Sequence, residues 1–266
     1  MKTIASNLRI FWQGTLLSYI ALFGWLRPVT YLATKIIGPL MQMLFFTFLG
    51  TFATGSENAQ FYVIGNAVQI AALSGIYGVT MSVGGERWAG TLVYLFGTPA
   101  NRMMMFFGRA FMHIIDGALG VVIAFAWGLL LLGLDLSRTN LPALGLTIIV
   151  TTISTCGLGL LMGCLSLVTA NVGFVNNTVY FLLLIFSGAN VKLSILPAWM
   201  QATSSVLPLT RGIASARALI AGAGIQEILP LLAQELGIGL VYGLLGYFLF
   251  KWVEVSAKQR GTLETI

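Results

Sequence analysis

Charged residues are scarce in this sequence of 266 residues: 8% are Asp, Glu, Lys or Arg, whereas 58% are hydrophobic. A soluble domain carries about 25% charged residues, because its surface faces water. A surface that faces lipid needs few such groups. The composition therefore excludes an ordinary soluble domain and predicts an integral membrane protein, whose length is divided among spans of about 20 residues each.

Histidine and cysteine are also nearly absent, with His113, Cys156 and Cys164 as the full set. One histidine and two cysteines are too few for a zinc site. The cysteines are about 12 Å apart along one expected helix, too far for a disulfide, so we expect two buried, inert thiols. No Gly-x4-Gly-Lys-Ser/Thr segment occurs, which excludes ATP binding by a P-loop in this chain.

Apolar segments of helical length predict an all-α integral membrane fold, with six transmembrane helices in a single domain over residues 1–266. Segment 3–27 mixes apolar and polar residues at nearly helical spacing, and we expect an amphipathic helix in the cytoplasmic interface. It ends at Arg27-Pro28, because the residue before a proline disfavours helix. The expected spans are about 29–52, 61–83, 104–132, 142–168, 173–191 and 231–252.

Segment 192–230 is apolar but broken by prolines and glycines, and it also carries Arg211 and Arg217. It is too interrupted for one straight span and too apolar for a free loop. Non-helical backbone at membrane depth has to be buried in protein or line a wet cavity. The pattern predicts a re-entrant segment of two short helices that dip into the outer leaflet.

The basic residues predict the orientation of the chain. With the N-terminus inside, ten of the fourteen Lys and Arg residues fall on the cytoplasmic side; the outer side keeps Arg138, Lys192, Arg211 and Arg217. This asymmetry places both termini in the cytoplasm, in agreement with an even number of spans. The basic residues form no continuous stripe, so we expect no nucleic-acid partner.

Small residues predict where helices approach closely. Gly159-x3-Gly163 lies in the fourth expected span and Gly239-x3-Gly243 in the sixth. Glycines one turn apart let the backbone of a neighbouring helix come near. We therefore expect close helix contacts at both positions.

Three ionisable residues, Arg109, His113 and Asp116, fall on one face of the third expected span. One interpretation is a proton relay; the other is an internal ion pair in which Arg109 offsets the cost of burying Asp116. We favour the ion pair, because a relay needs further members across the bilayer. Glu235 in the sixth span is expected to face the bundle or to reach water.

Residues 85–102, GERWAGTLVYLFGTPANR, join the second and third spans on the inner side. The segment is longer than a turn and compatible with a short amphipathic helix from Glu86 to Pro99. Glu86 at its start would suit a helix N-terminus through the macrodipole. A plain interfacial connector is the simpler interpretation, but the exposed mix of acidic, basic and aromatic residues favours a docking surface for a cytoplasmic partner.

This segment resembles the coupling segment of the type-2 ABC transporter permeases. The shared pattern is Glu86-x3-Gly90-Thr91-Leu92-x2-Leu95-x2-Thr98-Pro99-x2-Arg102. The family often has an acidic residue after Gly-Thr-Leu, where this chain has Val93. Segment Pro208-Leu209-Thr210-Arg211-Gly212 is similar to the re-entrant region before the last helix of the family.

The resemblance implies a permease subunit of the plasma or inner membrane that is not itself an enzyme. It would pair with a second permease copy or a paralogue and bind two cytoplasmic ABC ATPase subunits, which would hold ATP and Mg²⁺. This chain would bind no cofactor. The residues implied in ATPase coupling are Glu86, Gly90, Thr91, Leu92, Leu95, Thr98 and Pro99.

The resemblance further implies export. Short outer loops favour a lipophilic or amphipathic, drug-like cargo, as in multidrug efflux, and a lipid-linked glycan is the alternative. A proton-driven secondary transporter that uses His113 and Asp116 is a second class; a membrane enzyme is disfavoured, since no inner-face cluster of His, Asp or Glu appears. Polar residues that either line the substrate path or hydrogen-bond helix to helix are Asn66, Gln69, Asn176, Asn177 and Tyr180.

Overall fold

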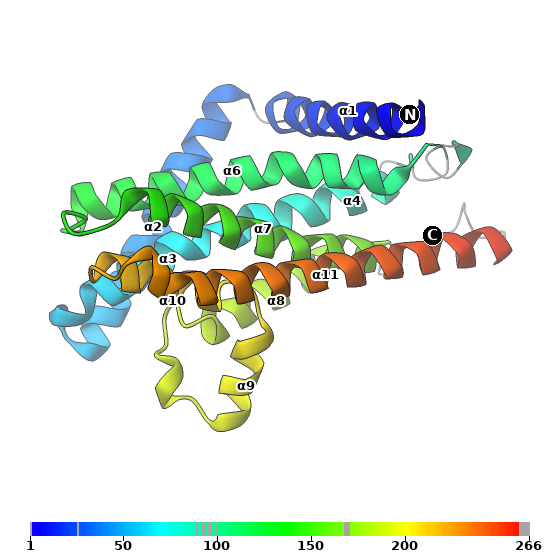
Figure 1. Ribbon diagram of the computed structural model, residues 1–266. Coiled ribbons are helices and arrows are strands. Elements are labelled where there is room, and N and C mark those ends of the chain that lie inside the picture. The colour runs from blue at the N-terminus through cyan, green and yellow to red at the C-terminus, as the bar shows by residue number, and fades with distance from the viewer. Residues whose placement is uncertain are drawn as a thin grey trace.

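The computed structural model describes residues 2–25, 27–88, 90–91, 94, 97–98, 100–167 and 171–260. These described residues form helices joined by turns and loops, without a strand, as the composition predicts. Five of the described helices are long and apolar enough to cross a membrane. Figure 1 shows most of the long helices side by side in one elongated bundle.

Helix α1 (Lys2–Trp25) packs along the first half of α6 (Arg102–Leu131) (Figure 1). The two backbones nearly touch: a Cβ added at Gly14 or at Gly108 would lie 2.5 Å or 2.0 Å from a carbonyl oxygen of the other helix. Thr15 Oγ1 donates to the Gly108 carbonyl at 2.9 Å. The expected N-terminal helix is therefore present and closely attached to the bundle, and its place in the membrane interface stays a prediction.

The first expected span is confirmed as helix α2 (Pro28–Thr54). Pro28 starts it, where the missing N–H costs nothing, and Gly55 ends it at φ +95°. In its most apolar stretch 17% of the residues are buried, and Phe52 is 92% exposed. This helix therefore presents a broad apolar face to its surroundings.

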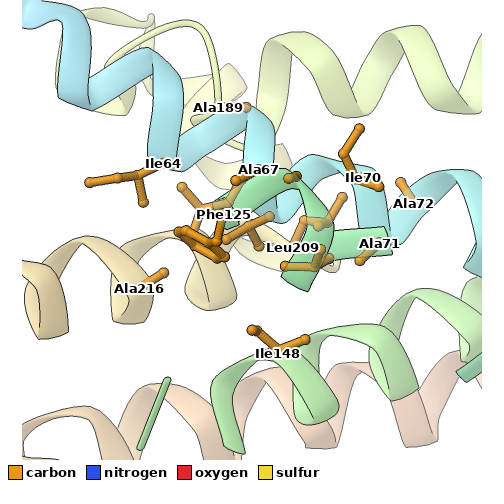
Figure 2. Close-up of a cluster of buried hydrophobic side chains, with 14 of the residues drawn as sticks. Ile64, Ala67, Ile70, Ala71, Ala72, Phe125, Ile148, Ala189, Leu209 and Ala216 are labelled. Atoms are coloured by element: carbon orange, nitrogen blue, oxygen red, sulfur yellow. The ribbon is translucent and has the colours of Figure 1, made fainter. Parts of the chain in front are cut away.

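The second expected span is a continuous rod of α3 (Ala59–Ala72), a π-helical turn η2 (Leu73–Gly78) and α4 (Val79–Trp88). The 3-10 turn η1 (Ser56–Asn58) connects it to α2. In its most apolar stretch 72% of the residues are buried. Figure 2 shows its small and branched side chains meeting residues of other helices, with Ile64, Ala67, Ile70, Ala71, Ala72, Phe125, Ile148, Ala189, Leu209 and Ala216 labelled.

The fourth expected span, α7 (Leu141–Ser166), is the other central helix, with 78% of its most apolar stretch buried. A Cβ added at Gly159 would lie 1.9 Å from the Gly75 carbonyl oxygen, and one at Gly163 would lie 2.8 Å from Val83. The close contact predicted from these glycines is thus confirmed. The α3–α4 rod and α7 form the centre, around which α2, α6 and α11 (Ile225–Arg260) pack.

Helix α11 begins at Ile225, six residues before the expected start of the sixth span. Pro230, the sixth residue of this helix, lies inside it without ending it. The helix approaches α7 closely at Gly239, where an added Cβ would lie 2.5 Å from the Ser154 Cα. At Gly243 no described atom lies within 4 Å of an added Cβ, so the second glycine of this pair leaves open space instead.

The fifth expected span, 173–191, is only partly helical. Helix α8 (Val172–Phe186) has 15 residues, or about 22 Å, and turns follow from Ser187 to Gly188, where φ is +81°. Helix α8 is therefore shorter than the five helices that could cross a membrane. The count of six spans and the orientation of the chain stay predictions.

The re-entrant segment contains two short helices, α9 (Ala198–Val206) and α10 (Thr210–Ile220), after the 3-10 turn η3 (Leu193–Ile195). This part of the prediction is confirmed, and its depth in the outer leaflet stays a prediction. The fully buried carboxylate of Glu235 accepts the N–H of Leu209 at 2.6 Å and so caps α10 from α11. Glu235 therefore faces the bundle, one of the two positions expected for it.

Candidate coupling site

Glu86 lies in the last turn of α4 and connects three parts of the chain. One carboxylate oxygen accepts Nη2 of Arg109 from α6, and the other accepts the Thr91 hydroxyl. The side chains of Glu86 and Arg109 are 15% and 14% exposed. Arg109 also donates through Nη1 to the Ser82 carbonyl at 2.6 Å. The carboxylate thus ties α4 to α6 and to the segment that follows α4.

Helix α4 ends in a turn that explains the Gly-Thr pair of the sequence motif. Gly90 has φ +66°, and the Thr91 N–H donates back to the Glu86 carbonyl at 2.9 Å. A glycine in the left-handed region followed by such a back-directed hydrogen bond is the Schellman arrangement that stops a helix. The expectation that Glu86 starts the coupling helix was wrong: this residue belongs to the end of α4.

Parts of the expected coupling helix lie outside the described residues, including Leu92, Leu95 and Pro99. Tyr94 and Gly97 are described and have helical backbone. The Tyr94 side chain is 77% exposed. The described part therefore exposes an aromatic side chain, whereas Glu86 is occupied by contacts within the chain.

The far end of the segment is attached to α6 and α11. Arg102, the first residue of α6, pairs through Nη1 with Glu254 near the end of α11 and donates through Nη2 to the Thr98 carbonyl at 2.6 Å. The side chains of Arg102 and Glu254 are 12% and 16% exposed. Sequence reasoning missed Glu254, because it lies 152 positions from its partner and belongs to no local motif.

Two ion pairs attach the two ends of the segment to the helix bundle. Its beginning is attached to α6 through Glu86 and Arg109, and its end is attached to α11 through Arg102 and Glu254. Charge-assisted hydrogen bonds of this kind are stronger and more directional than neutral ones. The segment after α4 is therefore joined to two long helices, one at each of its ends.

The predicted ion pair between Arg109 and Asp116 was wrong. Asp116 pairs with Lys35 of α2, whose Nζ is 2.5 Å from Oδ2, and it also accepts the hydroxyls of Tyr31 and Ser74. Arg109 lies two turns away and reaches the end of α4 instead. The Lys35 side chain extends into the bundle and reaches Asp116 from another helix. The spacing of residues within α6 cannot predict such a contact between distant segments.

Two of the expected substrate-path residues connect helices inside the bundle. Asn66 donates to Asn190 Oδ1 at 2.8 Å, and Gln69 accepts the Ser187 hydroxyl at 3.1 Å. Both side chains are fully buried. These contacts favour the structural interpretation, in which polar groups hold helices together.

The other expected path residues lie on α8. Tyr180 donates to Gln42 Oε1 of α2 at 2.9 Å, and Tyr77 donates to Asn177 Oδ1 at 2.5 Å. Asn177 is exposed. Asn176 is fully buried, and its side-chain amide has no hydrogen-bond partner among the described residues. The face shared by α2, η2 and α8 therefore combines hydrogen-bonding groups with aromatic rings at the surface.

Within the described ranges, no group of three His, Cys, Asp or Glu side chains could hold a metal ion. Cys156 and Cys164 are both buried and free. Residues 13–221, more than three quarters of the chain, match the family model described as ABC-2 type transporter. No curated protein matches the chain. The matched region includes Glu86 and Arg109.

Proposed function

The chain belongs to the ABC-2 type transporter family, and from this we propose that it is the permease subunit of an ATP-driven exporter. It is a multi-pass membrane component of such a transporter, without a catalytic domain. Two cytoplasmic ABC ATPase subunits would bind ATP and Mg²⁺. A second copy of the chain or a paralogue would complete the membrane part.

The attachment of Glu86 to Arg109 and Thr91 is the observation that supports this mechanism best. An ATPase that closes on ATP would move the segment after α4, and the two ion pairs would pass this movement to α6 and α11. The ATPase supplies the free-energy difference between two states, and the helix bundle supplies the two arrangements. The exposed Tyr94 is our candidate for the contact with the ATPase.

For the cargo, we propose a lipophilic or amphipathic small molecule that leaves the cell along the face of α2 and α8. The support is chemical: Phe45 and Phe48 of α2 are exposed, and Asn177 adds a hydrogen-bonding group on α8. A surface that combines apolar area with a few polar groups suits an amphipathic molecule.

A lipid-linked glycan is the second candidate cargo, and one observation favours it. The Tyr77 and Tyr180 rings are 5.7 Å apart, and Phe181 lies 6.3 Å from Tyr180. Tyr180 is buried, but Phe181 beside it is exposed, and an exposed aromatic ring of this kind can stack on a sugar ring.

A proton-driven mechanism is less well supported. Asp116 is held by Lys35, Tyr31 and Ser74, which is a compact network within α2, η2 and α6. Such a local network resembles a structural ion pair more than a relay, since a relay needs groups that continue across the bilayer.

Reconstitution in lipid vesicles tests the proposal. The chain is purified with its copurifying ATPase, and ATP-dependent transport of an amphipathic fluorescent dye is compared with that of a lipid-linked glycan. We expect transport of one of them, with full dependence on ATP and on the ATPase. Transport by the chain alone under a proton gradient would contradict the ABC mechanism.

A further inference from the structure

An apolar groove of about 490 Å³ lies between α6, α7 and α11, with α1 at one edge. Its walls are almost entirely hydrocarbon and aromatic, with Phe111, Ile114, Leu160 and Leu244 among them. All three wall helices belong to the set that could cross a membrane. The groove therefore lies where acyl chains are the surrounding solvent.

Glycine keeps this groove open. Helices α7 and α11 touch at Gly157, where an added Cβ would lie 2.2 Å from the Gly239 carbonyl oxygen. One turn further along α11, Gly243 lines the groove and has no described atom within 4 Å of an added Cβ. The two helices meet again at Gly246, where an added Cβ would lie 3.0 Å from the Leu161 nitrogen, so Gly243 between the two contacts opens onto the groove and leaves a slot there.

A second, polar pocket of about 340 Å³ adjoins the groove and shares Phe107 and Tyr247 with it. Its lining includes Arg102, Glu254 and Lys251. Glu254 is paired with Arg102, so Lys251 adds a surplus positive charge to the pocket. Lys251 is exposed, and its Nζ lies 5.2 Å from the centroid of the Tyr247 ring.

We propose that the two joined pockets bind one anionic phospholipid, with an acyl chain in the groove and the phosphate at Lys251. The apolar groove and the cationic pocket follow one another along α11, as the acyl chain and the phosphate follow one another in a phospholipid. Gly243 and Lys251 are separated by about 12 Å along the helix, which fits the distance from a headgroup to the middle of an acyl chain. Basic pockets between membrane helices are known to hold anionic headgroups.

A lipid phosphate at Lys251 would lie next to the ion pair that attaches the end of the coupling segment. The polar pocket contains Arg102, which attaches the end of this segment to Glu254 of α11. A bound lipid would bridge α6 and α11 beside this ion pair. Occupancy of this lipid site is measured without ATP. The test is therefore independent of the proposed cargo and of the ATPase.

Native mass spectrometry of the full chain, purified in detergent and titrated with lipid, tests the proposal. We expect one phosphatidylglycerol to be retained about fivefold more tightly than phosphatidylcholine, since one lysine near a headgroup contributes about that factor. Lys251→Gln removes the charge and should bring the two lipids within about twofold of each other. Lys192→Gln, at another exposed lysine, is the control and should keep the preference.

A second variant tests the groove independently of charge. Gly243→Phe places a ring in the open slot and should lower the occupancy of both lipids. Gly145→Phe is its control, because Gly145 on α7 also has open space around an added Cβ but does not line the groove. Equal retention of the two lipids by the unaltered chain would overturn the proposal, and so would unchanged lipid binding in a folded Gly243→Phe variant. If Gly243→Phe fails to fold, Lys251→Gln decides alone.

Discussion

Nη2 of Arg109, two turns inside α6, donates to the carboxylate of Glu86 at the end of α4. The acidic residue of the coupling motif therefore has its partner within the chain. The other carboxylate oxygen accepts the Thr91 hydroxyl, so the beginning of the coupling segment is held against two helices. Glu86 is consequently held by contacts within the chain and shapes the beginning of the segment that follows α4.

Tyr94 is predicted to contact the ATPase. Replacing it by Ala should weaken ATPase binding about tenfold or more, because exposed tyrosines at interfaces often contribute this much. Stability should stay unchanged, since the side chain is 77% exposed. Binding is measured by biolayer interferometry with the purified complex partners. Trp199→Ala in the re-entrant segment, where the side chain is 66% exposed, is the control; an equal loss there would contradict the assignment.

The contact between α7 and η2 predicts a steric effect. Gly159→Ala would place a Cβ 1.9 Å from the Gly75 carbonyl oxygen, so the two helices would have to separate. We expect a loss of about 1–3 kcal/mol in the free energy of unfolding. Gly145→Ala, with open space around the added Cβ, should be neutral or stabilising. Thermal unfolding in detergent compares the two, and equal stability would show that the close contact is wrong.

The cap on α10 predicts a specific role for Glu235. In Glu235→Gln one carboxylate oxygen is replaced by an amide that cannot accept the N–H groups of Leu209 and Arg211 equally. We expect a loss of about 1.5–3 kcal/mol in stability, because hydrogen bonds to a buried charge are among the stronger ones. Glu227→Gln, an exposed position on the same helix, should have a smaller effect. Differential scanning fluorimetry distinguishes the two variants.

The network around Asp116 predicts coupled mutations. Asp116→Asn leaves Lys35 without its counter-ion, and we expect a loss of about 3 kcal/mol or more in stability. Adding Lys35→Met should recover most of this loss, because the unpaired charge is removed. The double variant should also retain ATP-driven transport. A stable double variant without transport would favour the proton relay instead.

Sequence alone predicts the helices that are marked by residues close together in the chain. Long apolar runs give the helices α2, α6 and α7 to within a few residues, and prolines and glycines in 192–230 give the two short helices there. The end of α8 at Phe186 was missed, because apolar composition continues through the turns that follow it.

Contacts between distant segments could not be predicted in the same way. Lys35 and Asp116 are 81 positions apart, and no helical spacing relates them. The same holds for Arg102 and Glu254, whose pairing depends on how α6 and α11 pack. The coupling motif was found because its residues are contiguous, but the turn at Gly90 required the backbone conformation.

Charge reversal of the Glu86–Arg109 pair tests the coupling mechanism most directly. ATP-driven dye transport is measured in vesicles that contain the chain and its ATPase, for Glu86→Arg, for Arg109→Glu and for the double variant. Each single variant should lower transport about tenfold or more, since a charged hydrogen bond of this kind contributes at least that factor. The double variant should recover a large part of it, with equal membrane insertion in all three. Full transport in both single variants would contradict the account.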